Sequence, residues 1–157
     1  MDAPQLIGGE WLAGMHPFAV TDKYSGETIA APGAADESQT AAAVAAAKAA
    51  FEGPAIPCHR RYRILMQAAE VLEGRRAEIV DLMVAETGFT LADNNGDFDR
   101  CIQTLQTSAE EAKRLTGDMI PMEGAPGHDG ELAFTLRVPL GVIAAITPFN
   151  SPLNTVA

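Results

Sequence analysis

The spacing of hydrophobic and polar residues changes twice along this chain of 157 residues. Up to about residue 35, apolar residues come in short runs separated by turns that contain glycine, notably Gly8-Gly9 and Tyr24-Ser25-Gly26. Runs of this kind predict two short hairpins, one over residues 5–11 and one over residues 18–30. The N-terminal part is therefore expected to form small strand pairs.

From Asp36 to Gly117 the apolar residues recur every three or four positions, which predicts four amphipathic helices. The first begins at Asp36, with Gln39 placed to complete a capping box, and the fourth begins at Asp93 or Asn94. The residues expected to face a core are Thr40, Val44, Ala47 and Phe51 in residues 36–52; Ile64, Leu65, Ala68, Val71 and Leu72 in residues 57–73; Ile79, Val80, Leu82 and Met83 in residues 75–86; and Phe98, Cys101, Ile102, Leu105, Ala109 and Ala112 in the last helix.

The final part of the chain returns to extended patterns. Residues 121–130 favour a loop, and residues 131–138 alternate as a strand with one buried face does. Residues 141–147 form a short apolar run, typical of a strand covered on both faces in a parallel sheet. Ser151 can cap a helix that begins at Pro152. Asn150 lies in the turn between them, where ligands bind in open α/β sheets, although the pattern alone favours a simple turn former between two prolines.

The run Arg137-x-Pro139-x-Gly141-Val142, followed by Ile146-Thr147-Pro148-Phe149-Asn150-x-Pro152, resembles the start of the cofactor-binding core of the NAD(P)-dependent aldehyde dehydrogenase superfamily. The resemblance implies an α/β fold class, namely the N-terminal helical part and first core strand of a Rossmann-type cofactor domain, incomplete. Residues 1–157 would be a single partial domain. Its parts would be hairpins and helices over 1–120, a loop and β-ribbon of the oligomerisation type over 121–139, and the first core strand, Pro-Phe-Asn turn and helix start over 140–157.

The same resemblance implies the chemistry. Asn150 would be the catalytic residue, whose amide donates a hydrogen bond to the substrate oxygen as a thiohemiacetal forms. Ile146, Thr147, Pro148 and Phe149 would bind the cofactor, lining the nicotinamide and ribose of NAD or NADP. In the family the nucleophilic Cys lies farther downstream. The expected function is thus the N-terminal fragment of an oxidoreductase that converts an aldehyde to a carboxylic acid, and the isolated chain is predicted to be inactive. The alternative is a catalytically inert chain that acts only as an interaction or structural module.

Composition and charge narrow the other possibilities. Eleven basic and 21 acidic residues give a net charge of −10, which opposes nucleic-acid binding. Cys58 and Cys101 lack nearby Cys or paired His residues, so neither a disulfide nor a metal site is predicted. The N-terminus lacks the features of a secretory signal and no run is long enough to span a membrane, so a cytoplasmic location is expected. The expected partners are a small-molecule aldehyde and, for the full-length enzyme, further copies of itself in a homo-oligomer.

Two further sequence features are assigned no chemical role, and a third keeps two interpretations. Asp93–Asp97 looks like a calcium loop, but Thr104 stands where the twelfth position requires Glu. The arginines of residues 60–63 are expected on the outer face of a helix, solvated or paired with carboxylates. Residues 132–138 can form the family's oligomerisation ribbon or an ordinary intramolecular hairpin, and the pattern leaves both open. Which aldehyde is oxidised, and whether NAD or NADP is used, also stays open.

Overall fold

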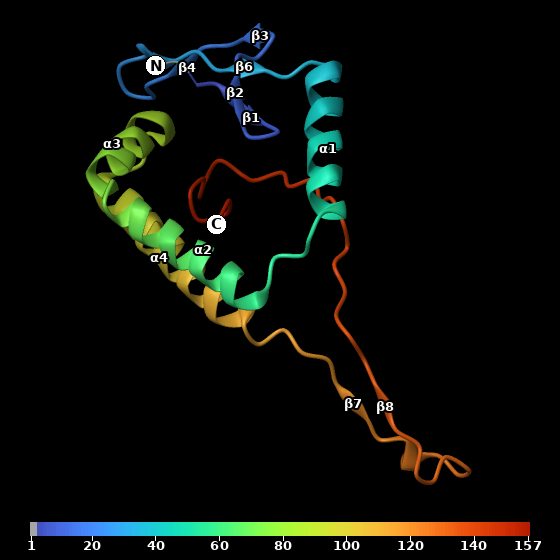
Figure 1. Ribbon diagram of the computed structural model, residues 1–157. Coiled ribbons are helices and arrows are strands. Elements are labelled where there is room, and N and C mark those ends of the chain that lie inside the picture. The colour runs from blue at the N-terminus through green and yellow to red at the C-terminus, as the bar shows by residue number, and fades with distance from the viewer. Residues whose placement is uncertain (1–2) are drawn as a thin grey trace.

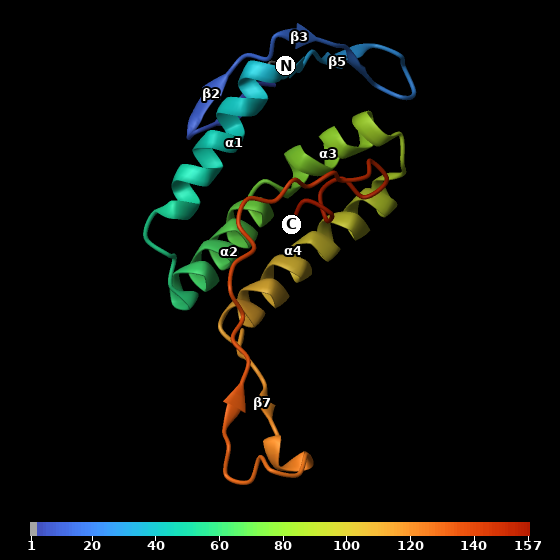
Figure 2. The ribbon, with the colours of Figure 1, turned by 90° about the vertical axis from the view of Figure 1, so that its right-hand side faces the viewer.

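The computed structural model describes residues 3–157. The helices and short strand pairs are arranged in an open, elongated molecule (Figure 1 and Figure 2). A compact monomer of this mass, 16.5 kDa, would expose about 7,500 Å² of surface. This chain exposes 11475 Å². Much of the surface that a compact domain buries is therefore open in this one.

Antiparallel strand pairs form the N-terminal layer. The chain turns between the first two strands at Gly8 and Gly9, whose φ angles of 63° and 90° lie in the left-handed region that glycine adopts at little cost. Both predicted hairpins are confirmed, and a third pair that the pattern did not predict extends the layer. The pairs are β1 (Gln5–Ile7) with β2 (Glu10–Leu12), β4 (Val20–Thr21) with β5 (Thr28–Ala30), and β3 (His16–Pro17) with β6 (Gly33–Ala34).

Helix α1 (Glu37–Glu52) begins as predicted but does not pack as predicted. The Asp36 carboxylate accepts a hydrogen bond from the Gln39 backbone N–H at 2.7 Å, and the Asp36 N–H donates to Gln39 Oε1 at 3.4 Å. The residues expected to face a core, including Val44 and Phe51, are exposed. That expectation is wrong because α1 stands apart from the other helices (Figure 1), and no described element covers its apolar stripe.

Three helices form the packed part of the molecule, which we call the bundle: α2 (Cys58–Glu73), α3 (Arg76–Thr87) and α4 (Leu91–Ala112). The predicted stripe of α4 is confirmed, because five of its six residues are buried and Ile102 is half-buried. The buried apolar side chains are Ala69 from α2, Val80 and Met83 from α3, and Phe98, Cys101, Leu105, Ala109 and Ala112 from α4. Ile64, Val71 and Leu82 were expected to face this core and are exposed instead.

The start of α4 differs from the prediction by one turn. Thr90 is the capping residue, and its Oγ1 accepts a hydrogen bond from the Asp93 N–H at 3.1 Å. Asp93 and Asn94 lie inside the first turn, so neither caps the helix. The Asn94 side chain is buried and donates to the carbonyl oxygens of Phe89 and Thr90, each at 3.2 Å. This bond pattern fixes the corner between α3 and α4.

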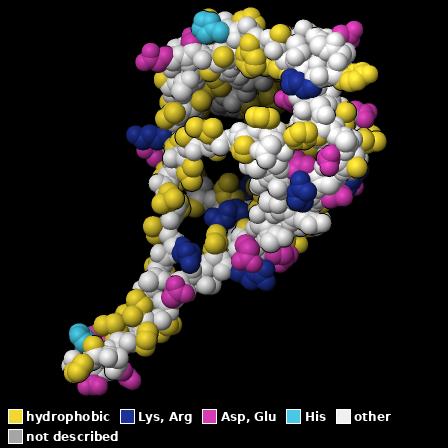
Figure 3. Space-filling model, turned by 180° about the vertical axis from the view of Figure 1, so that it is seen from behind, with side chains coloured by type: hydrophobic (Ala, Val, Ile, Leu, Met, Phe, Trp, Pro, Cys, Tyr) yellow, Lys and Arg dark blue, Asp and Glu magenta, His cyan; other side chains and the backbone are white. Residues whose placement is uncertain are grey.

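Residues 117–138, which we call the arm, project away from the bundle (Figure 2). Strand β7 (Met119–Ile120) pairs with β8 (Ala133–Phe134), and the short 3₁₀ helix η1 (Met122–Gly124) lies in the loop between them. The predicted strand over 132–138 is therefore shorter than expected. Its apolar residues are exposed rather than buried on one face, and hydrophobic side chains lie along the arm in Figure 3. The reason is that a two-stranded ribbon buries neither face unless another layer covers it.

Residues 141–147 lie outside any sheet, so the predicted core strand is absent from this chain. Ile146, which a strand of this kind would bury, is 98% exposed. A parallel strand needs a neighbouring strand for its hydrogen bonds and helices over both faces. No described residue supplies either, and the run stays extended.

Candidate functional site

The chain comes back to the bundle immediately after the turn that carries Asn150 (Figure 1). Ser151 Oγ donates a hydrogen bond to Asp97 Oδ1 on α4, and Thr104 Oγ1 on the same helix donates to Asn154 Oδ1 at 2.7 Å. Leu153 packs against the core cluster shared by α2 and α4. Residues 151–155, which we call the C-terminal turn, are therefore fixed to α4 by polar and apolar contacts.

The predicted cap at Ser151 is not formed. Residues 152–156 form hydrogen-bonded turns rather than a helix. Within them the Thr155 N–H and Oγ1 both donate to the Ser151 carbonyl oxygen, at 3.1 Å and 2.6 Å. The Ser151 hydroxyl is occupied by the carboxylate of Asp97 and does not reach the backbone of the next turn. A tertiary contact has thus replaced the local one.

Asn150 lines a cleft of about 280 Å³ between the C-terminal turn and the first turns of α4. The side chain is exposed, and among residues 3–157 its amide makes no hydrogen bond. An amide nitrogen carries two N–H donors, so both are available to a ligand in this cleft. The other residues that line the Asn150 cleft are Phe89, Asp93, Asn94, Asp97, Arg100 and Pro152.

The charged residues of the Asn150 cleft are partly neutralised within it. Asp97 is buried, and its Oδ1 also accepts a hydrogen bond from Arg100 Nη2 at 3.1 Å. Its second oxygen, Oδ2, is buried without a hydrogen-bond partner among the described residues. One turn along α4, burial raises the pKa of the Cys101 thiol, and the nearby Asp97 charge raises that pKa further. Cys101 therefore stays protonated at neutral pH.

The four predicted cofactor residues lie next to Asn150 in the chain but outside its cleft. Ile146 to Phe149 are all exposed, with 82% of Phe149 accessible, so their backbone and side chains are open to a planar ring. Residues 138–157 contain no Lys or Arg, so no cationic side chain of this segment is available to pair with the diphosphate of a dinucleotide. A fit of NAD or NADP to this segment is therefore partial: the exposed residues leave room for a planar ring, and the diphosphate has no cationic side chain beside it.

Among the residues that line the cleft, sequence reasoning gave Phe89, Asp97 and Arg100 no place beside Asn150. The available signal was the position of Asp97, which follows Asn94 by three residues and precedes Cys101 by four, on the apolar stripe of the predicted helix. A polar side chain on the buried face of a helix must find a partner there. Which partner it finds cannot be inferred from helical spacing.

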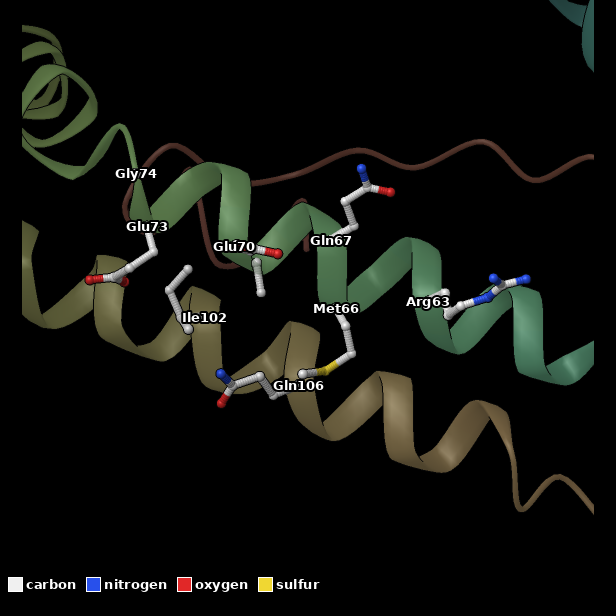
Figure 4. Close-up of a pocket in the computed structure, with 9 residues that line it drawn as sticks. Arg63, Met66, Gln67, Glu70, Glu73, Gly74, Ile102 and Gln106 are labelled. Atoms are coloured by element: carbon white, nitrogen blue, oxygen red, sulfur yellow. The ribbon is translucent and has the colours of Figure 1, made fainter.

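A second hollow lies along the line where α2 and α4 pack (Figure 4). Met66 on α2 extends toward Gln106 on α4, and Ile102 lies between the helices. Neither Asn150 nor any of the predicted cofactor residues lines this groove. Among residues 3–157, no group of three or more His, Cys, Asp or Glu is placed to hold a metal ion. No helix in this range is long and apolar enough to cross a membrane.

Comparison with known proteins gives consistent matches. Residues 11–157 match the Aldehyde dehydrogenase family. The 3-sulfolactaldehyde dehydrogenase of Priestia aryabhattai is 41% identical over 150 residues, which are 96% of this chain and 31% of that protein. The chain thus spans about a third of the length of this relative.

Two solved structures align with 99% of this chain and 33% of their own. Aldehyde dehydrogenase 21 from Physcomitrella patens, in complex with the reaction product succinate, has a TM-score of 0.91 and 27% identity. The NADP-dependent glyceraldehyde-3-phosphate dehydrogenase from Bacillus halodurans C-125, complexed with NADP, has a TM-score of 0.87 and 28% identity. The predicted fold class, an α/β fold of this type in its N-terminal part, is confirmed. The division into 1–120, 121–139 and 140–157 stays a prediction.

Proposed function

Because this chain belongs to the aldehyde dehydrogenase family, we propose that the gene product carrying it oxidises an aldehyde to a carboxylic acid with NAD or NADP. The observation that supports a role for this chain is the Asn150 amide, whose two N–H donors are unpaired at the edge of a cleft. In the proposed reaction Asn150 donates to the aldehyde oxygen while that oxygen becomes negatively charged. A preorganised donor of this kind lowers the barrier by about 3 kcal/mol.

The environments of the two cysteines indicate whether residues 1–157 supply the nucleophile of the proposed reaction. Cys101 is 1% exposed and its pKa is raised by burial, so it cannot attack a substrate. Cys58 is exposed but does not line the Asn150 cleft. Neither thiol of residues 3–157 is thus placed to attack an aldehyde held by Asn150. We therefore propose that residues 1–157 on their own have no dehydrogenase activity.

The cofactor contact proposed for this chain is limited to the nicotinamide end. When bound, NAD or NADP supplies the hydride acceptor. Thr147 and Phe149 are exposed beside Asn150, where a hydroxyl and an aromatic ring suit a ribose and a planar ring. The choice between the two cofactors rests on residues other than these, because the ribose that distinguishes them belongs to the adenosine end.

The proposed substrate class is a small aldehyde that carries an acidic group. The relative from Priestia aryabhattai is named for a sulfonated aldehyde, and the Physcomitrella patens structure contains succinate, a dicarboxylate. Arg100 is the one Lys or Arg among the described residues that line the Asn150 cleft. More than half of its side chain is exposed, which leaves it accessible to an anion.

The arm is proposed as a subunit contact of a homo-oligomer. Its exposed apolar side chains, among them Phe134 and Leu136, support this, because contiguous apolar surface exposed to water marks protein–protein contact sites. A full-length variant Leu136→Asp should dissociate in light-scattering measurements, whereas Thr135→Ser, a change at the preceding residue of the arm that keeps the hydroxyl, should not. A cytoplasmic location stays a prediction from the sequence.

The experiment that tests the proposed function measures NADH or NADPH formation at 340 nm. The full-length gene product is assayed with acidic aldehydes and with neutral aldehydes of similar size, and Asn150→Ala is compared with wild type. We expect kcat to fall by about 10²-fold or more while the KM for the cofactor is unchanged. A loss confined to cofactor affinity would contradict the role of Asn150. Aldehyde-dependent absorbance from a verified 157-residue chain would contradict its proposed inactivity.

A further inference from the structure

Asp97 is a buried carboxylate for which the proposed chemistry has no use. It lies on the inner face of α4 with 5% of its surface exposed, and it lines the Asn150 cleft. Its Oδ1 accepts hydrogen bonds from Ser151 Oγ and from Arg100 Nη2. Because a buried charge is costly unless it is paired and hydrogen-bonded, these two donors hold the carboxylate in one orientation.

Asp97 is linked to Asn150 through the Ser151 side chain, which hydrogen-bonds to Asp97, and through the one peptide bond between Ser151 and Asn150. Ser151 follows Asn150 directly, and the peptide bond between them is planar and rigid. On the other side of Asn150, residues 142–149 are all exposed and belong to no sheet. The position of Asn150 is therefore set from its C-terminal side, where Ser151 is the first residue that hydrogen-bonds to the bundle.

We propose that Asp97 is a positioning residue, which accepts the hydrogen bond of Ser151 and so holds the Asn150 amide at the cleft. This inference rests on the proposed function, because it takes Asn150 as the donor to the substrate oxygen. Asp97 holds the C-terminal turn through Oδ1 alone, since no group of residues 3–157 hydrogen-bonds to Oδ2. Removing the Ser151 hydroxyl therefore breaks this hydrogen bond and leaves the carboxylate in place, paired with Arg100.

The test is a double-mutant cycle in the full-length enzyme. Ser151→Ala is combined with Asn150→Ala, and kcat and both KM values are measured for the two single variants and the double variant. Ser151 is partly exposed, so its loss leaves the core intact. We expect Ser151→Ala to lower kcat by roughly 10- to 100-fold, because a displacement of about 1 Å at a reacting group costs up to about 10²-fold. The KM for NAD or NADP should not change.

In the Asn150→Ala background the same substitution should lower kcat no further, because the amide that it displaces is already gone. Asp97→Ala should match Ser151→Ala. Asp97→Asn, in contrast to Asp97→Ala, should keep most of the wild-type kcat, since its amide oxygen still accepts a hydrogen bond from Ser151. The matched control is Ser38→Ala, which removes another Ser-to-Asp hydrogen bond, at the start of α1, and should leave kcat unchanged.

The outcomes separate this inference from the proposed function. If Asn150→Ala keeps the wild-type kcat, the proposed function fails and the role of Asp97 fails with it. If Asn150→Ala is impaired but Ser151→Ala lowers kcat by the same factor in both backgrounds, Asn150 is catalytic and Asp97 does not position it. A Ser151→Ala enzyme with wild-type kcat would likewise show that Asp97 does not position Asn150.

Discussion

Replacement of Phe98 by alanine should remove a large part of the stability of the bundle. Phe98 has no exposed surface, and the Arg76 guanidinium lies 4.4 Å from the centroid of its ring. Truncation of a buried phenylalanine costs about 3–5 kcal/mol. The cation–π contact adds about 0.5–1 kcal/mol, at the low end because a third of the Arg76 side chain is exposed. We expect a total loss of about 4 kcal/mol.

The assay is urea unfolding of the 157-residue chain, followed by helical circular dichroism. The matched control is Phe134→Ala on the arm, where the exposed ring should change the free energy of unfolding by no more than about 0.5 kcal/mol. Phe98→Leu, which keeps most of the volume, should cost less than about 1.5 kcal/mol. If Phe98→Ala costs no more than Phe134→Ala, the bundle is not the stabilising core of this chain.

Three other predictions concern local features. In the native chain Cys58 should react with a thiol reagent at pH 8 and Cys101 should not, because burial raises the pKa of the Cys101 thiol; equal labelling of both by mass spectrometry would contradict its burial. Thr90→Ala should lower the free energy of unfolding by about 1 kcal/mol through loss of the α4 cap, whereas Thr116→Ala should not. The backbone N–H of Gln39, and next the Ser38 hydroxyl, hold the pKa of Asp36 below its ordinary value of 3.8. The resulting stability is present above that pH and lost as pH falls through the lowered pKa, so Asp36→Asn should flatten the acid side of the helicity curve; an unchanged curve would refute this.

The features that the sequence predicted correctly are those whose causes lie within a few residues. The capping box needs only Asp36 and Gln39, and the first hairpin needs only Gly8-Gly9. The stripe of α4 follows from helical periodicity, because Phe98, Cys101 and Leu105 must share a face. Each of these depends on backbone geometry that does not change with the surroundings.

The predictions that failed needed partners distant in the chain. A buried strand over 141–147 requires neighbouring strands, and the apolar stripe of α1 requires a covering layer. Ser151 has the composition of a helix cap, yet its hydroxyl bonds to Asp97, which is 54 residues away. A catalytic role for Asn150 could be predicted from family resemblance, but the hydrogen bond of its neighbour Ser151 to Asp97 could not.

The order of elements along the chain also has a consequence for biosynthesis. The bundle is contiguous from residue 58 to residue 112, so it has all its internal contacts as soon as α4 has emerged from the ribosome. The apolar segment 132–149 is synthesised later, and its exposed apolar side chains remain able to associate with other chains. Misassembly between nascent copies should therefore begin in that late segment, while the helices made before it are already folded and resist proteolysis.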